Sequence, residues 1–287
     1  MSSAAAVPRP RLPAEPPARP AAGARWRVVA VDGARVRLLE VGRGEPLLFL
    51  HGWGLSPAAY ADGLTRLAAG GVRVLAPGLP GFGGSDRLPF AGVDLPSYAR
   101  RVGRLLDVLG HGSPVQVAGH SFGGGVALQL ARDRPEQVRA LTLLNPVGGA
   151  SGRGGTGVWL GHALAAAAEL APGAAARSAP AVLRDFLPHL ARPATLALTA
   201  RLALSAALAP TAAALVAAGL PVRVVWSDRD RLVARGALAR VAGLSSQVVP
   251  GSHGWLLDDP AAFAALLGEV LEVSAAAPVR ASGRITP

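Results

Sequence analysis

The chain has 287 residues, 51% of them hydrophobic, which is enough for one large domain or for a core domain with an insertion and argues against wholesale disorder. It contains no cysteine, so it has no disulfide, thiol nucleophile or cysteine-ligated metal. Its formal net charge is +11, but all 29 basic residues are arginines in a sequence rich in Ala, Gly and Pro, a pattern typical of a GC-rich genome. No basic stripe interleaved with aromatic residues is present, so we expect no nucleic-acid partner.

Both ends of the chain are predicted to lie outside the folded domain. Residues 1–24 are rich in Pro, Ala and Arg, lack the apolar segment of a secretory signal, and are expected to form a disordered tail; residues 276–287 are expected to form a flexible one. The Ala- and Leu-rich stretch 193–220 is long enough for a membrane span, but Arg201 and Pro210 favour buried or interfacial helices. We therefore expect no stable membrane span and, by default, a cytoplasmic location.

Short apolar runs alternate with helical patterns in the first half of the chain. The first two runs flank Asp32-Gly33, which predicts a hairpin. The later runs are nearly continuous, which is typical of strands in a parallel sheet that is covered on both faces. Strands are expected at 26–31, 35–41, 46–52, 72–78, 115–121 and 138–145, and helices at 57–69, 95–109 and 122–132. This alternation predicts an α/β fold with a doubly wound, mostly parallel sheet.

The pattern of the sequence changes at residue 148. Residues 148–219 show no strand pattern and consist of several helix-length pieces rich in Ala, Leu and Pro. A strand returns at 221–230, followed by a helix, a further strand in 246–253 and a final helix at 260–272. We therefore predict an α/β core made of residues 25–147 and 220–275, with an all-helical insertion at 148–219.

A serine stands where the strand at 115–121 meets the following helix. Gly119-His120-Ser121-Phe122-Gly123 matches G-x-S-x-G, the nucleophile elbow, in which a tight strand-to-helix turn holds the serine in a strained conformation. Larger residues at positions 119 and 123 would clash in such a turn. The spacing therefore makes Ser121 the candidate nucleophile, presented by its glycine neighbours.

A nucleophilic serine needs a base, and the base needs an orienting acid. Of the six histidines, only His253 follows the strand that returns at 221, and it lies in a loop before the last helix. Asp230 is the preferred acid because it lies farther into the loop after that strand; Asp228 is the alternative and could instead cap a turn. Asn145 ends an earlier strand but cannot act as a carboxylate.

The His51-Gly52-Trp53-Gly54 segment follows the strand at 46–50, where a loop N–H can meet the N–H after the nucleophile. We assign the oxyanion hole to the backbone N–H groups of Trp53 and Phe122. His51, Gly52, Gly119, His120 and Gly123 are expected to shape the site. The Trp53 side chain either lines the acyl pocket or fills the core, and the sequence favours neither.

Together these motifs resemble the α/β-hydrolase superfamily. HGWG (51–54), PGFGGSD (80–86), GHSFGG (119–124), WSDRD (226–230) and GSHGW (251–255) occur in the family's order, and the resemblance covers about residues 28–272. It implies an eight-stranded sheet, a helical cap inserted after the sixth strand, and neither a metal nor a cofactor. Ser227 departs from the family's W-G-x-x-D pattern, which weakens the assignment of the acid.

The resemblance also limits the reaction. Haloalkane dehalogenases and epoxide hydrolases of this fold use Asp as the nucleophile, so Ser121 disfavours both. Members similar to proline iminopeptidase bind a substrate amine with cap carboxylates, but this insertion has only Glu169 and Asp185, which we expect to be solvated or to line the lid. We expect a serine hydrolase of small or medium apolar carboxylic esters. The alternatives are a C–C bond hydrolase of a diketone-like compound and a non-hydrolytic member, either a ligand-binding protein or a biosynthetic cyclase.

Overall fold

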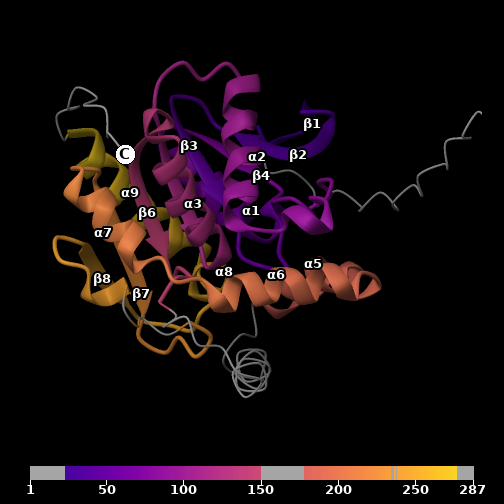
Figure 1. Cartoon of the computed structure of the whole chain (residues 1–287). Coiled ribbons are helices and arrows are strands. Elements are labelled where there is room, and N and C mark those ends of the chain that lie inside the picture. The colour runs from indigo at the N-terminus through magenta and orange to yellow at the C-terminus, as the bar shows by residue number, and fades with distance from the viewer. Residues whose placement is uncertain (1–22, 150–177, 234–235, 237, 277–287) are drawn as a thin grey trace, which may run out of the picture.

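The computed structural model describes residues 23–149, 178–233, 236 and 238–276. An eight-stranded sheet runs through the molecule in the order β1-β2-β4-β3-β5-β6-β7-β8 (Figure 1). Its strands are β1 (Arg25–Val31), β2 (Ala34–Val41), β3 (Glu45–Leu50), β4 (Val72–Pro77), β5 (Val115–His120), β6 (Val138–Leu144), β7 (Val222–Ser227) and β8 (Ser245–Val249). β2 is antiparallel to β1 and to β4, and every other pair is parallel. The predicted fold class is confirmed.

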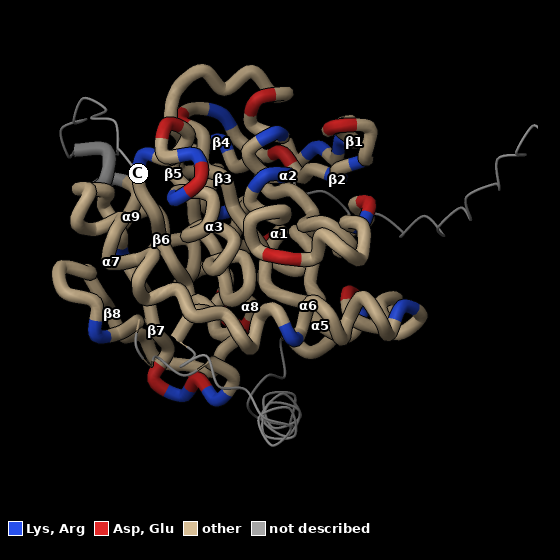
Figure 2. The backbone as a smooth tube through the Cα atoms, in the orientation of Figure 1, with Lys and Arg blue, Asp and Glu red and all other residues tan. Residues whose placement is uncertain are grey.

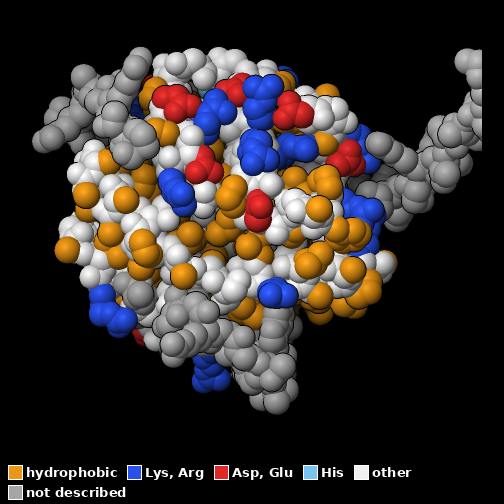
Figure 3. All heavy atoms as spheres, viewed as in Figure 1, with side chains coloured by type: hydrophobic (Ala, Val, Ile, Leu, Met, Phe, Trp, Pro, Cys, Tyr) orange, Lys and Arg blue, Asp and Glu red, His pale blue; other side chains and the backbone are white. Residues whose placement is uncertain are grey.

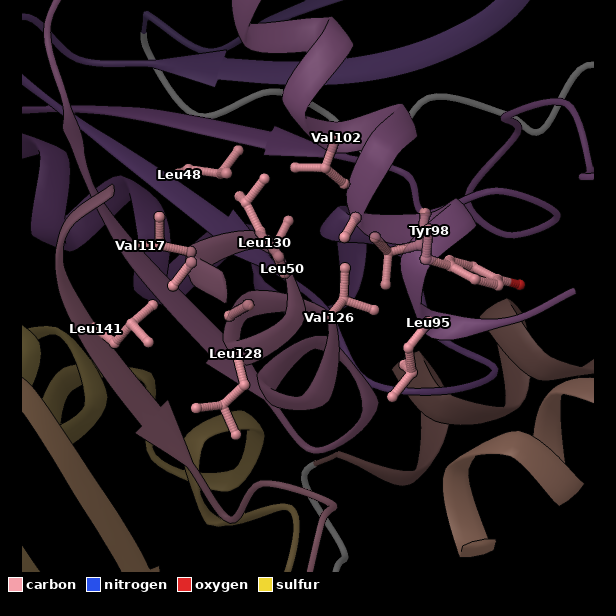
Figure 4. Close-up of a cluster of buried hydrophobic side chains, with 14 of the residues drawn as sticks. Leu48, Leu50, Leu95, Tyr98, Val102, Val117, Val126, Leu128, Leu130 and Leu141 are labelled. Carbon is pink, nitrogen blue, oxygen red and sulfur yellow. The ribbon is translucent and has the colours of Figure 1, made fainter. Parts of the chain in front are cut away.

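Helices cover both faces of the sheet, and alternate residues of the central strands face opposite layers. Leu48 and Leu50 of β3 pack with the helices on one side (Figure 4), whereas Leu47 and Phe49 pack with those on the other. The first side is covered by α2 (Leu95–Val108), α3 (Phe122–Asp133) and α7 (Ala209–Ala217). The second is covered by α1 (Ala61–Ala69), α8 (Trp255–Asp258) and α9 (Pro260–Ala276). Short 3-10 helices η1 (Pro57–Tyr60), η2 (Phe90–Gly92), η3 (Pro135–Gln137) and η5 (Leu238–Arg240) lie in the connections.

The helix α7 belongs to the core layer. Ala212 is fully buried and joins Leu215 in the core cluster beside α3. A crossover helix is required at this point because β6 and β7 are parallel neighbours. Just before this helix, Ala207 forms an antiparallel β-bridge with Gly149, so residues 149 and 207 lie side by side. Residues 209–217 thus form a helix that packs with the core, within the stretch 148–219 that the sequence assigns to the helical insertion.

The rest of the described insertion lies over the loops that follow β3 and β4. It consists of α5 (Ala179–Phe186), η4 (Leu187–Ala191) and α6 (Pro193–Ser205), which we call the cap. The indole Nε1 of Trp53 donates to Thr199 Oγ1 of α6 at 2.8 Å, and the His189 ring of η4 lies 5.0 Å from that of Phe82. The Trp53 side chain thus contacts the cap, so the loop after β3 and the cap are joined.

A buried carboxylate fixes the cap to the core. Asp185 Oδ2 accepts hydrogen bonds from the Ser56 N–H at 2.9 Å and from Ser56 Oγ at 2.6 Å, and Asp185 Oδ1 pairs with Arg184. Its side chain is only 1% exposed, so the expectation of a solvated or lid-lining Asp185 is wrong. The other cap acid in that expectation, Glu169, lies outside the described residues. No helix in the described part of the chain has the length and apolar character needed to cross a bilayer.

Replacing Asp185 by Ala should lower the free energy of unfolding by about 2–3 kcal/mol, because the buried Ser56 N–H and hydroxyl lose their acceptor. Urea denaturation measures the change. Asp62→Ala is the matched control: Asp62 is 62% exposed and pairs with Arg66 on the surface, so its loss should leave stability close to that of wild type. Equal stability of the two variants would contradict this account of the cap.

Candidate active site

Ser121 lies on a strained turn between β5 and α3. Its backbone has φ 52° and ψ −116°, a conformation that costs a non-glycine residue about 1–3 kcal/mol. The turn is held because the Ser121 carbonyl accepts from the N–H groups of Gly124 at 3.0 Å and Val147 at 3.1 Å. A β-carbon at Gly119 would overlap the Gly123 backbone, and one at Gly123 would overlap the carbonyl oxygens of Leu50 and His51. The glycines therefore allow α3 to begin directly against the end of β3.

Asp230 and His253 form a buried pair. Asp230 Oδ2 accepts from His253 Nδ1 at 2.8 Å, and their side chains are 5% and 10% exposed. Asp230 Oδ1 is held by the N–H groups of Leu232 and Val233 at 2.8 and 2.9 Å, so the carboxylate cannot rotate freely. Because Nδ1 carries the proton in this pair, Nε2 is the basic nitrogen of the ring.

Asp228 has a different environment. Its side chain is 51% exposed, and its Oδ1 accepts from the Gly251 N–H at 2.8 Å, which fastens the loop after β8 to the end of β7. Of the two acids that the sequence left open, the structure brings Asp230 to the histidine and Asp228 to the backbone.

The expected oxyanion donors lie at the junction of β3 and α3. Phe122 is the first residue of α3, and the N–H groups of a first helical turn have no acceptor within their helix. The Gly52 N–H is not available as an oxyanion donor, because it donates to Tyr60 Oη at 3.0 Å. The next amide along this loop is that of Trp53, the second donor expected from the sequence.

A chain of hydrogen bonds joins this junction to the His253 loop. Tyr60 Oη, which accepts from Gly52, lies 2.8 Å from His120 Nδ1, and His120 Nε2 donates to the His253 carbonyl at 3.1 Å. The rings of His120 and His253 lie 4.8 Å apart. The residue before Ser121 therefore fixes the backbone of the loop that carries the candidate base.

Asn145 fixes the same loop from β6. Its backbone is left-handed with φ 42°, and its side chain is fully buried. Asn145 Nδ2 donates to the His253 carbonyl at 3.2 Å and to Ser227 Oγ at 2.8 Å, while Asn145 Oδ1 accepts from the Ser227 N–H at 2.7 Å. The serine that departs from the family pattern thus supplies an acceptor for Asn145. The sequence excluded Asn145 as an acid but gave no signal for this fastening role.

The histidines around the site are held neutral. His51 accepts from the Leu79 N–H at Nε2 and donates to the Gly52 carbonyl at Nδ1, both at 2.8 Å. Complete burial lowers the pKa of His51 to about 4 and that of His120 well below its ordinary value. Within residues 23–149, 178–233 and 238–276, no three His, Cys, Asp or Glu side chains lie close enough together to hold a metal ion.

Comparison with known proteins places the chain in a family. The sequence profile of the alpha/beta hydrolase family matches residues 47–266, and the chain belongs to this family. It is 40% identical over 122 residues to a putative non-heme haloperoxidase of Mycobacterium phage D29, covering 42% of this chain and 43% of that protein. It is 36% identical over 124 residues to the 2-hydroxymuconate semialdehyde hydrolase of Pseudomonas sp. strain CF600, covering 42% and 44% of the two chains.

In both sequence comparisons the match spans less than half of the relative's length. Similarity of structure extends further. A membrane phospholipase A described as a bacterial virulence factor superposes with a TM-score of 0.70 at 24% identity, over 89% of this chain and 88% of that one. This likeness concerns the fold. The family as a whole supports a hydrolase enzyme.

The neutral His51 predicts a pH dependence of stability. Unfolded His51 titrates near its ordinary pKa of 6.5, whereas folded His51 titrates at about 4. Between these values the unfolded chain binds a proton that the folded chain does not, so the free energy of unfolding falls as the pH is lowered from 7 to 4, by up to about 3 kcal/mol for this group. Urea denaturation across this range should give a shallower pH dependence for His51→Gln than for wild type. An identical dependence would contradict the assignment.

Tyr60→Phe should loosen two loops at once, since it removes the hydroxyl between the Gly52 N–H and His120 Nδ1. Hydrogen exchange followed by mass spectrometry should be faster in peptides covering 51–56 and 251–256. Tyr98→Phe is the matched control, because Tyr98 is equally buried but its hydroxyl donates to the Pro80 carbonyl. Unchanged exchange at 251–256 in Tyr60→Phe would show that the chain of hydrogen bonds does not hold the His253 loop.

Proposed function

We propose that the chain is a serine hydrolase in which Ser121, His253 and Asp230 act as a catalytic triad on small or medium apolar carboxylic esters. The observation that carries the proposal is the combination of a strained serine at the elbow with a buried histidine whose Nδ1 is bound to Asp230. That arrangement leaves the histidine Nε2 as the base for a serine hydroxyl.

The reaction is acyl transfer. His253 Nε2 takes the proton from Ser121 Oγ, which attacks the ester carbonyl carbon and forms a tetrahedral intermediate. Asp230 stabilises the imidazolium and keeps its orientation. The intermediate then collapses: the C–O bond to the alcohol breaks, and His253 returns the proton to the leaving alkoxide. Water, activated by the same histidine, hydrolyses the acyl-enzyme. This chemistry uses neither a metal nor a cofactor.

The oxyanion of each tetrahedral intermediate binds the N–H groups of Trp53 and Phe122. A preorganised donor of this kind contributes about 3–4 kcal/mol to transition-state stabilisation. The Gly52 amide, which Tyr60 holds, aligns the loop without taking part in the hole.

An apolar substrate is supported by the cap. Leu196 and Leu202 of α6 are partly buried and pack against the core, as does Trp53 of the loop after β3, which contacts the cap. Asp185, the one acid of the described cap, is occupied by Ser56 and Arg184, so it is not available to bind a substrate amine. This weakens a peptidase of the kind that recognises an amino terminus.

C–C bond hydrolysis of a diketone-like compound is the second candidate. It is favoured by the 36% identity to a 2-hydroxymuconate semialdehyde hydrolase, a match that includes less than half of that enzyme. The same triad serves both reactions, so the substrate decides between them. A non-hydrolytic member, either a ligand-binding protein or a cyclase, would bind such compounds without hydrolysing them.

Purified full-length protein should hydrolyse p-nitrophenyl esters, with kcat/KM varying along a series of acyl chain lengths, and Ser121→Ala should abolish turnover. Asp230→Asn should lower kcat by about 10³–10⁴-fold, the loss expected when the orienting acid is neutralised. Asp228→Asn is the matched control and should stay close to wild type. Equal losses in the two Asp variants would refute the choice of acid. Turnover of a 2-hydroxy-6-oxo-dienoate without ester hydrolysis would favour the second candidate.

A further inference from the structure

Exposed leucines gather on the outer side of the cap. Of the eight large hydrophobic side chains that are exposed in the described part of the chain, four lie on α5, η4 and α6: Leu183 (47% exposed), Leu187 (55%), Leu190 (55%) and Leu198 (38%). Figure 3 shows hydrophobic side chains gathered over α5 and α6. The four leucines, with Arg192 and Arg201, define what we call the outer face of the cap.

The spacing of Leu183, Leu187 and Leu190 places them opposite the side of the cap that contacts the core. Leu183, Leu187 and Leu190 are four and three residues apart, and the buried Asp185 points the other way, to Ser56. On α6 the buried Thr195 and Thr199 form the inner side. The exposed Arg201 lies away from them, and Leu198, three residues from Thr195, lies at the edge between the two sides. α5 and η4 therefore turn three leucines to solvent, and α6 adds Leu198 and Arg201 beside them.

The exposed charged side chains of the described cap are all arginines. Residues 178–217 contain three arginines and a single acid, Asp185, which is buried and paired with Arg184. Figure 2 shows few charged residues along α5 and α6. Apolar side chains flanked by guanidinium groups, with no exposed carboxylate among the described residues of the cap, match an interface that is both apolar and anionic.

We propose that the outer face of the cap binds an anionic lipid surface, with the leucines inserted among the acyl chains and Arg192 and Arg201 bound to headgroup phosphates. Arginine side chains suit this position because their stems pack on apolar material while the guanidinium stays at the polar level. The inner side of the same helices contacts the loop that carries Trp53. Binding would hold the candidate active site about one helix diameter, ~10 Å, from the lipid. The proposal does not depend on the reaction proposed above.

Two other binding partners fit the outer face of the cap less well: a different protein and a second copy of this chain. Protein partners are usually met by aromatic anchors and a polar rim, whereas the large exposed hydrophobic side chains of α5, η4 and α6 are leucines. A second copy of the chain, related by two-fold symmetry, would present the same arginines and no exposed carboxylate of the described cap, and an interface between two faces of like charge is unfavourable. An anionic lipid surface offers acyl chains to the leucines and phosphates to the arginines.

Co-sedimentation with vesicles tests the proposal on the full-length chain. Wild type should bind vesicles of phosphatidylcholine mixed with phosphatidylglycerol, bind pure phosphatidylcholine far less, and be released by high salt. Leu187→Ser/Leu190→Ser and Arg192→Gln/Arg201→Gln should each weaken binding at least tenfold, since one arginine near an anionic surface accounts for about a fivefold change. Thermal unfolding should show that both variants remain folded.

Three controls make the result specific. Val28→Ser/Val108→Ser removes exposed apolar side chains elsewhere, and Arg100→Gln/Arg132→Gln removes exposed arginines elsewhere; both should bind like wild type. The N-terminal segment is also basic, so Arg9→Gln/Arg11→Gln/Arg19→Gln should retain most of the binding. Failure of wild type to bind, loss of binding only in the N-terminal variant, or full binding by the leucine variant would each overturn the proposal. So would a dimer in sedimentation equilibrium that the leucine variant dissociates.

Discussion

The close approach of α3 to the end of β3 is the constraint on which the candidate site depends. Gly123 lies where any β-carbon would overlap the carbonyl oxygens of Leu50 and His51. That close approach accompanies the strained turn of Ser121, and it lies where β3 and β5, which are parallel neighbours, end. The strain costs about 1–3 kcal/mol and is maintained by the surrounding sheet.

A second requirement is that loops from separate parts of the chain keep a fixed geometry. The His253 carbonyl receives donors from His120 at the end of β5 and from Asn145 after β6, and His120 is joined through Tyr60 to Gly52. Each bond contributes only about 1 kcal/mol to stability, but an unpaired partner at these buried positions costs more. Burial keeps His51 and His120 neutral, so the network has the same protonation state throughout the neutral pH range.

Local chemistry explains what could be predicted from the sequence. The turn around Ser121, the order of the strands and helices, and the loop positions of Asp230 and His253 follow from glycine spacing and apolar periodicity. Tyr60, Asn145 and the Asp185–Ser56 contact could not be predicted, because each depends on which distant side chain a polar group meets after folding. The sequence also does not distinguish α7 from the cap, because α7 is as rich in Ala and Leu and only its packing against α3 differs.

Labelling of the full-length chain with a fluorophosphonate, followed by peptide mass spectrometry, tests the central claim that Ser121 is an activated nucleophile. In this reaction Ser121 Oγ attacks phosphorus and displaces fluoride, so no knowledge of the substrate is needed. The account predicts one adduct, on Ser121, formed rapidly in wild type and lost in Ser121→Ala and His253→Ala. A folded wild-type protein that is not labelled, or an adduct that forms as fast in His253→Ala, would contradict it.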